Sequence, residues 1–276
     1  MYRHQFAAMN MIYQRYSFRY FLESMQRLGI QKFELWTGAP HLNCLVSSLS
    51  DTRSTKNMID SYGLTATCLT PEQVVYPYNI AASNEELRKL SMDYFCRYIE
   101  MAAEMKIPKM LCASGWGDYD EPKEQAWKRS FDSLEILLKK AEACHVVLAF
   151  EILQDFESNL CNDLSSTQRV MEHFDSPFFS LCVDTVPMRR TQKNVVDFFN
   201  IFGKRICHFH LTDGTPSGHM PTGTGDAPLY DYLDELGALG YSGDITLEIG
   251  DTSWADRPEE ATKISFDTID RYLSEH

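Results

Sequence analysis

The hydrophobic positions along this chain follow two different spacings, and the two kinds of segment alternate from end to end. Short runs of aliphatic and β-branched residues are typical of strands that are buried on both faces, as in parallel sheets. Longer segments in which apolar residues recur every three or four positions predict amphipathic helices. The short runs predict strands at 6–12, 32–36, 64–69, 109–114, 146–153, 180–185, 206–213 and 244–250.

A helix is predicted after each of these strands. The first is typical, because Ser17 can cap its start and Gly29 can end it. The predicted helices cover 17–28, 50–62, 83–106, 122–144, 165–174, 191–203, 229–239 and 258–273.

Alternating strands and helices predict parallel strands joined by right-handed crossovers. Eight such units close into a barrel, so we expect an α/β fold made of a single (β/α)8 TIM barrel domain over residues 1–276. No Pro-rich spacer or change of composition marks a place to divide the chain. A doubly wound open sheet is the alternative, and it is disfavoured because no glycine-rich phosphate loop follows the first strand.

The acidic composition narrows the choice of partners. The formal net charge is −13, which argues against nucleic acid or an anionic membrane as a partner, because both need a basic face. No apolar segment approaches the ~20 residues that span a bilayer. The eight cysteines form no C-x-x-C pair, and the N-terminus lacks the apolar core of a signal peptide. We therefore expect reduced thiols and a cytoplasmic protein.

Four predicted strands carry a side chain at or near their end that can bind a metal ion. Three end in the acidic residues Glu151, Asp184 and Glu248, and the fourth carries His210. A single histidine on an apolar strand is more often a hydrogen-bonded core residue, but a carboxylate at the end of a buried strand is costly unless it is paired or bound to metal. Because the carboxyl ends of barrel strands meet at one rim, the four side chains predict a single metal site.

One histidine with three carboxylates makes an oxygen-rich site that suits Mn²⁺ or Mg²⁺, with Mn²⁺ preferred, and Co²⁺, Fe²⁺ or Zn²⁺ can also occupy it. Four protein ligands leave two positions of an octahedral ion open to adjacent substrate oxygens. The ion then acidifies a C–H between those oxygens by stabilising the developing enediolate. We expect Glu151 and Glu248, from strands five and eight, to remove and return the proton as catalytic groups. In the alternative, both are only ligands and water transfers the proton.

Several short motifs resemble one enzyme family, and the resemblance covers essentially the whole chain. The motifs that resemble the sugar isomerase/epimerase branch of the xylose-isomerase-like barrels are Phe150-Glu151, Val183-Asp184-Thr185, His208-Phe209-His210 and Leu247-Glu248. The stretches that begin at Glu34, Thr70 and Glu157 are most similar to the fructoselysine 3-epimerases, which stand beside the ketose 3-epimerases in this branch.

The resemblance carries implications for the site. It implies that Glu151, Asp184, His210 and Glu248 hold the metal, that the two glutamates exchange the C3 proton, and that Glu157 lies beside the substrate oxygens. The segment from His219 matches the family's His-x-x-x-Gly-x-Gly pattern. A small-molecule sugar as substrate, and dimers or larger homo-oligomers, are further implications of the resemblance.

Two positions depart from the ketohexose 3-epimerases. Pro187 stands where those enzymes have a histidine three residues after the ligand aspartate, and Pro216 stands where they have an arginine. Both changes remove polar contacts to substrate oxygens. These departures argue against a free ketohexose and leave open an Amadori-type substrate, such as fructoselysine, or another ketose derivative.

Residues in the loops after the predicted strands are candidates for substrate binding. Besides Glu157 and His219, they are Trp36, His41, Glu72, Tyr78 and Trp116. The two tryptophans either stack on a sugar or fill the barrel mouth. The long loop after the third strand, which also contains Tyr76, either contacts the substrate or packs against the protein. His208 lies one layer below His210, so we expect a buried or supporting role for it rather than a ligand.

Together these features predict a metal-dependent sugar epimerase, an isomerase that acts at C3 of a ketose or ketosyl-amine. An aldose–ketose isomerase or a polyol dehydratase could use the same metal site, and both remain open. An endonuclease of the abasic-site type needs further ligands and a basic groove, which the net charge disfavours. A non-catalytic sugar-binding barrel is a third class, and the complete set of four ligands does not favour it.

Overall fold

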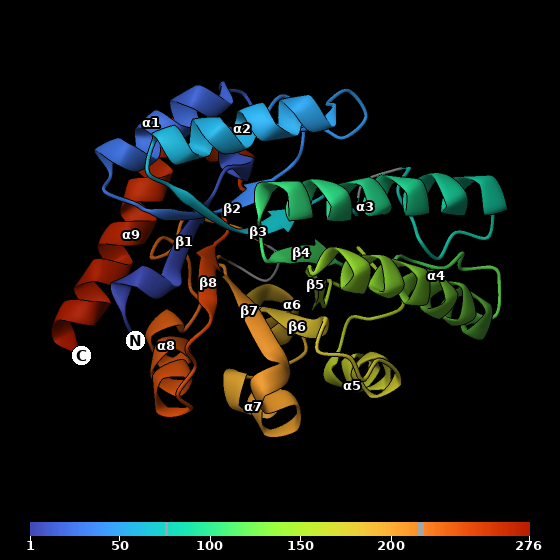
Figure 1. Cartoon of the computed structure of the whole chain (residues 1–276). Helices are drawn as coiled ribbons and strands as arrows, with labels where there is room; N and C mark the ends of the chain where they lie inside the picture. Colours follow the sequence, from blue (N-terminus) through green and yellow to red (C-terminus); the bar gives the residue numbers. More distant parts are fainter. Residues whose placement is uncertain (75–76, 215–217) are drawn as a thin grey trace.

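The computed structural model of the chain describes residues 1–74, 77–214 and 218–276 (Figure 1). Parallel strands close into a barrel in the order β1 to β8, and β8 pairs with β1. The strands are β1 (Phe6–Met9), β2 (Lys32–Trp36), β3 (Thr65–Thr70), β4 (Lys109–Cys112), β5 (Val147–Glu151), β6 (Phe179–Asp184), β7 (Ile206–Leu211) and β8 (Asp244–Leu247). The predicted (β/α)8 barrel is confirmed.

Helices cover the outside of the barrel (Figure 1). They are α1 (Phe18–Arg27), α2 (Leu49–Ser61), α3 (Glu85–Met105), α4 (Lys123–Cys144), α5 (Leu164–His173), α6 (Thr185–Arg190), α7 (Val195–Phe202), α8 (Leu229–Ala238) and α9 (Pro258–Glu275). Side-chain caps fix several starts; Ser17, for example, accepts a hydrogen bond from the Tyr20 N–H at 3.2 Å. Within the described ranges, none of the helices is both long and apolar enough to cross a membrane.

The first strand is shorter than predicted. It ends at Met9, because the side chain of Asn10 bonds to the backbone of Trp36 on β2. The Asn10 amide accepts from the Trp36 N–H at 2.7 Å and donates to its carbonyl at 2.8 Å. The chain then turns into a short 3-10 helix, η2 (Met11–Tyr13), so the prediction of a strand as far as residue 12 is wrong.

The short helix α6 was not predicted. It begins directly after β6, because the Asp184 carboxylate accepts a hydrogen bond from the Val186 N–H at 2.8 Å and caps the helix. Pro187 lies in the first turn, where its missing N–H removes no helical hydrogen bond. The helix that was predicted over 191–203 begins only at Val195, after its own cap at Asn194.

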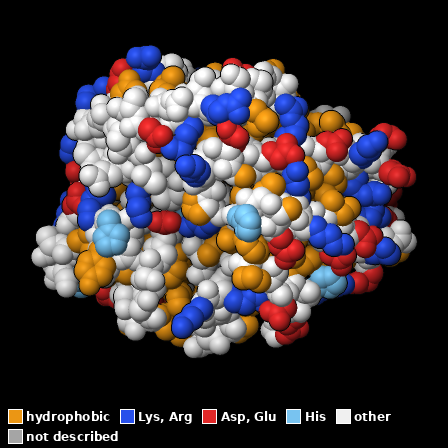
Figure 2. Space-filling model, in the orientation of Figure 1, with side chains coloured by type: hydrophobic (Ala, Val, Ile, Leu, Met, Phe, Trp, Pro, Cys, Tyr) orange, Lys and Arg blue, Asp and Glu red, His pale blue; other side chains and the backbone are white. Residues whose placement is uncertain are grey.

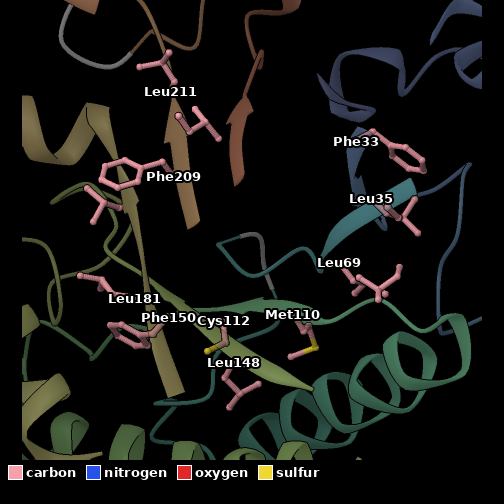
Figure 3. Close-up of a cluster of buried hydrophobic side chains, with 14 of the residues drawn as sticks. Phe33, Leu35, Leu69, Met110, Cys112, Leu148, Phe150, Leu181, Phe209 and Leu211 are labelled. Atoms are coloured by element: carbon pink, nitrogen blue, oxygen red, sulfur yellow. The ribbon is translucent and has the colours of Figure 1, made fainter. Parts of the chain in front are cut away.

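Successive side chains along each strand point alternately out toward the helices and in toward the barrel axis. Outward positions form the hydrophobic layer beneath the helices, part of which Figure 3 shows: Phe33, Leu35, Leu69, Met110, Cys112, Leu148, Phe150, Leu181, Phe209 and Leu211. Inward positions are far more polar. Besides a small cluster of Cys68, Leu111, Ala149 and Cys182, the buried inward side chains include Glu34, Lys109, His208 and Thr246. The barrel axis is therefore lined by charged and hydrogen-bonding groups.

Acidic and basic side chains are interspersed on the molecular face shown in Figure 2. Many surface charges are paired between helices, as in the bonds of Arg27 to Glu259 at 2.6 Å and Arg169 to Glu124 at 2.6 Å. Such exposed pairs each contribute roughly 0–1 kcal/mol to stability. The core and the barrel interior, rather than these pairs, therefore hold the fold together.

Candidate active site

The four predicted metal ligands converge at the carboxyl-terminal rim of the barrel. Glu151 ends β5, Asp184 ends β6, His210 lies one residue before the end of β7, and Glu248 directly follows β8. Each occupies an inward position of its strand. One ligand atom from each side chain lies within 4.8 Å of the other three, which is close enough for a shared ion.

The contacts of the His210 imidazole are the strongest indication that this cluster suits a cation. Its Nδ1 lies 2.7 Å from Glu151 Oε1 and 3.0 Å from Glu248 Oε2. Neither contact has hydrogen-bond geometry, and Nδ1 is a buried atom without a hydrogen-bond partner in the described part of the chain. Leaving such an atom unpaired costs about 1–3 kcal/mol. Carboxylate oxygens and an imidazole nitrogen that converge on one point fit a divalent ion.

The two glutamates at this point differ in proton affinity. Burial, assisted by the charges of Glu248 and Asp184, raises the pKa of Glu151 to about 8 against the lowering effect of His210. Burial alone would also raise the pKa of Glu248, but the charges of His210 and His219 outweigh it and lower that pKa. Without a bound ion, the two carboxyl groups around this space therefore differ in acidity.

A cavity of about 100 Å³ is lined by three of the four candidate ligands, Glu151, Asp184 and Glu248. Four of the predicted substrate-binding residues line it, namely Trp36, Glu72, Glu157 and His219. The indole N–H of Trp36 donates a hydrogen bond to the Glu72 carboxylate. Burial raises the pKa of Glu72, and the charge of Glu248 adds to that effect. Burial likewise raises the pKa of Glu157, whose carboxylate accepts from the Gln154 N–H at 2.9 Å.

His219 brings a positive charge to this acidic cavity. Its Nε2 lies 3.7 Å from Asp184 Oδ2 and 3.9 Å from Glu248 Oε2. Burial would lower its pKa, but the charges of Glu248, Asp184 and Glu157 together raise it to about 10. The imidazole is therefore protonated beside the ligands when no other cation is present.

The glycines of the His-x-x-x-Gly-x-Gly pattern have a structural explanation. Asp213, just beyond β7, accepts hydrogen bonds from the backbone N–H groups of Gly223 at 2.8 Å and Gly225 at 2.9 Å. A Cβ on Gly225 would lie 2.2 Å from the Gly214 nitrogen, so only glycine allows this approach. Asp213 thus folds the described part of the loop that carries His219 into the site.

Three predicted substrate-binding residues lie outside the lining of this cavity. The ring of His41 is engaged at both nitrogens, 2.6 Å from Asn10 Nδ2 and 2.9 Å from the Tyr16 carbonyl oxygen. Tyr78 stacks on Tyr94, with 3.7 Å between the ring centroids. Trp116 lines a neighbouring hollow that shares Val74 and Glu157 with the cavity. Tyr76 and Pro216 lie outside the described residues.

Two residues of the site were missed from the sequence. Gln73 lines the cavity, with its Nε2 3.5 Å from Glu151 Oε2. Glu34, fully buried on β2, contacts both His208 and His210 from below. The one available signal for Glu34 was an acidic residue in the middle of the apolar run Lys32–Trp36, at an inward position. His208 occupies the supporting position that was predicted, beneath His210.

The sequence from residue 22 to residue 272 matches the profile of the family described as the xylose isomerase-like TIM barrel. The chain belongs to this family. The resemblance drawn from the strand-end motifs is thereby confirmed.

Relatives of this chain include sugar epimerases. The fructoselysine 3-epimerase of Shigella flexneri is 26% identical over 239 residues, which cover 86% of this chain and 87% of that protein. The D-psicose 3-epimerase of Ruminiclostridium cellulolyticum is 22% identical over 84% of this chain and 78% of its own length. The solved structure of a D-psicose 3-epimerase with D-tagatose from Clostridium cellulolyticum H10 has a TM-score of 0.80 at 18% identity and covers 98% of both chains. Sugar epimerases are isomerases, which agrees with the predicted enzyme class.

Proposed function

We propose that this protein is a metal-dependent sugar 3-epimerase that acts on a ketose or ketosyl-amine. The observation that carries the proposal is the convergence of Glu151, Asp184 and Glu248 on His210, whose Nδ1 has no hydrogen-bond partner among residues 1–74, 77–214 and 218–276. This set occupies the end of a TIM barrel where catalytic groups are usual, in a chain whose relatives include sugar 3-epimerases.

Glu151, Asp184, His210 and Glu248 would hold one divalent ion, with Mn²⁺ preferred and Mg²⁺, Co²⁺, Fe²⁺ or Zn²⁺ as further candidates. When bound, such an ion stabilises the negative charge that develops on adjacent substrate oxygens as a proton leaves the carbon.

Glu151 and Glu248 are the groups that move the proton. They come from β5 and β8, with β6 and β7 between them in the barrel, so they approach a bound substrate from different directions. One carboxylate removes the proton from C3, and the other returns a proton to the opposite face, which inverts the carbon. His219 and Glu157 bind and orient the substrate oxygens from the cavity wall.

The charge of the cavity favours a ketosyl-amine over a neutral sugar. Its described lining contains the carboxylates of Glu72, Glu151, Glu157, Asp184 and Glu248. A divalent ion balances two of these charges, so the substrate faces the remaining negative charge. Gln73 Oε1, which has no partner in the part of the chain that the structure describes, adds a buried acceptor. A cationic nitrogen attached to the ketose would complement both features.

Solvent exchange tests this reaction directly. With Mn²⁺ present in deuterated water, each epimerised molecule should carry deuterium at C3, as detected by NMR. Deuterium at C1 or C2 with an aldose product would instead identify an aldose–ketose isomerase, and loss of water would identify a dehydratase. Epimerisation without any exchange would contradict the two-glutamate mechanism.

A further inference from the structure

Glu34 is the centre of a buried hydrogen-bond network directly beneath the candidate metal site. Its side chain has no exposed surface. Glu34 Oε2 lies 2.7 Å from His208 Nε2 and 2.6 Å from the Thr246 hydroxyl. His210 Nε2 lies 3.2 Å from both carboxylate oxygens, and the Thr70 hydroxyl donates to Oε1. Four donors therefore surround one carboxylate, which is as many as its lone pairs accept.

This arrangement determines which nitrogen of His210 carries the proton. An ionised carboxylate can only accept hydrogen bonds, so His210 Nε2 must be the donor and must carry hydrogen. In the neutral ring, the lone pair then lies on Nδ1. That is the nitrogen that faces Glu151 and Glu248 and has no hydrogen-bond partner in the described chain.

The orientation of Glu34 is itself fixed from below. Lys109 Nζ lies 3.3 Å from His208 Nδ1, and an ammonium group can only donate, so this nitrogen accepts. His208 must then carry its hydrogen on Nε2 and donate to Glu34. Lys109 is held in turn by Asp244 Oδ2 at 2.8 Å. Lys109 thus donates to both Asp244 and His208, and His208 and His210 both donate to Glu34, so the donor of each bond between β4, β8 and His210 is fixed.

We propose that Glu34 is a positioning residue that holds His210 in the tautomer whose Nδ1 can bind the metal ion, with His208 and Lys109 fixing Glu34. Carboxylate–histidine–metal arrangements of this kind orient the ring and raise its basicity. The inference rests on the proposed function only in that a cation occupies the four-ligand cluster. It does not depend on the substrate or on the reaction at C3.

Glu34, His208 and His210 are also close enough together to hold a cation themselves. The hydrogen bonds argue against this use, because the four donors already occupy the carboxylate. A second ion would have to displace protons from both imidazoles. The network therefore supports one ion above His210 rather than a second ion below it.

Metal binding to the stripped full-length protein tests the role of Glu34. Calorimetric titration with Mn²⁺ should give one ion per wild-type chain, and Glu34→Gln should weaken binding about 10–100-fold. Thr246→Val, which removes one donor to Glu34 and keeps every ligand, should weaken it by a smaller factor and decides the matter if Glu34→Gln does not fold. Ser133→Ala is the control, because it removes a buried hydrogen bond to the Ile80 carbonyl oxygen on the outer layer, and should leave Mn²⁺ binding unchanged.

Two spectroscopic measurements report on the ring itself. In the Zn²⁺-loaded protein with ¹⁵N-labelled histidine, NMR should show hydrogen on Nε2 of His210, and Glu34→Gln should alter that signature. The visible absorption of bound Co²⁺ should shift in the same variant. Wild-type Mn²⁺ affinity together with an unchanged tautomer in Glu34→Gln would overturn the inference, as would a second ion per chain that disappears in this variant. If Glu34→Gln weakened Mn²⁺ binding but the wild type showed no deuterium exchange at C3, the proposed reaction would be overturned and the role of Glu34 would stand.

Discussion

The two ends of the barrel interior both bury charged groups, but only one end neutralises them within the chain. At the amino-terminal end, the Asp244 carboxylate lies between two ammonium groups, 2.9 Å from Lys32 Nζ and 2.8 Å from Lys109 Nζ. At the carboxyl-terminal end, three carboxylates face one another across His210 Nδ1, which has no hydrogen-bond partner in the described ranges.

The two ends therefore differ in what their buried charges do: those at the amino-terminal end stabilise the fold, and we propose that those at the carboxyl-terminal end bind ligands. Desolvating an ion costs several kcal/mol unless a well-placed partner compensates. Asp244 has its partners in the fold, so its contribution is to stability. The acidic cluster at the other end lacks a sufficient counter-charge among the described residues, which is why we propose that an ion and a substrate complete it.

The largest effect should come from removing one of the two proton-transferring carboxylates. Glu151→Gln and Glu248→Gln keep the size of the side chain, and each should lower kcat about 10²–10⁴-fold, because general acid–base catalysis contributes on that scale. The free energy of unfolding without metal should fall little or even rise, since each change removes one ionisable carboxyl group from a cluster of mutually repelling carboxyl groups. A variant that keeps a tenth of the wild-type kcat would contradict the catalytic assignment.

The next largest effect should come from removing the metal ion, which should affect the carboxyl-terminal site and leave the amino-terminal ion pair intact. A chelator should abolish turnover, and Mn²⁺ at about 100 times its Kd should add about 2.7 kcal/mol to the stability of the folded chain. Calorimetry should show the transition temperature rising by several degrees on adding the ion. Lys109→Met should unfold at a lower temperature, because it breaks the amino-terminal pair, but should keep most of the increase. If the ion failed to stabilise wild-type protein, the site would not be a metal site.

Neutralising Asp244 should lower stability in a pH-dependent way. Burial would raise its pKa, but Lys109 and Lys32 outweigh burial and lower it. Asp244→Asn should therefore cost about 1–3 kcal/mol at neutral pH, since it leaves the buried ammonium of Lys109 and the half-buried one of Lys32 without their partner. The wild-type advantage is fully present above the unfolded pKa of about 3.9 and is lost as the pH falls through the lower folded value. Denaturation curves at pH 7 and pH 3 measure this difference, and an equal cost at both pH values would contradict the ion pair.

The smallest effect should be on substrate choice. Glu72→Gln should lower kcat/KM about tenfold for a ketosyl-amine, because one charge-assisted contact to the nitrogen is lost. It should change kcat/KM for the matching neutral ketose less than about twofold. Steady-state kinetics with both substrates give the ratio. Equal losses on both would indicate that Glu72 serves the cavity wall and not the amine.

The convergence of side chains at the carboxyl-terminal end of the barrel was easier to predict from the sequence than the ion pair at the amino-terminal end. Glu151, Asp184 and Glu248 were recognisable because an acidic residue that terminates an apolar run is unusual whatever its partners are. Glu34 lies 174 residues from its partner His208, and nothing in the local sequence pairs them. Lys109 and Asp244 stand at strand starts, where a charged residue is ordinary, so their pairing across 135 residues could not be inferred.

The predicted ends of strands were wrong where a side chain forms the hydrogen bonds that a backbone group would otherwise form. Asn10 ends β1 by bonding to the backbone of Trp36, and Asp184 both ends β6 and caps α6. In each case hydrophobic residues continue beyond the end of the strand, so the spacing of hydrophobic residues alone could not locate that end. His41 shows the same limit for site residues, because contacts to Asn10 and the Tyr16 backbone engage both of its nitrogens.

The most direct test of the central claim is the stoichiometry of Mn²⁺ binding to metal-stripped protein, compared between the wild type and Asp184→Ala. If the four strand-end side chains share one ion, calorimetry should find one Mn²⁺ per wild-type chain. Binding should be weakened at least tenfold in the variant, which still folds. Equal Mn²⁺ affinity in the two proteins, or no binding by the wild type, would contradict the claim that these side chains form a metal site.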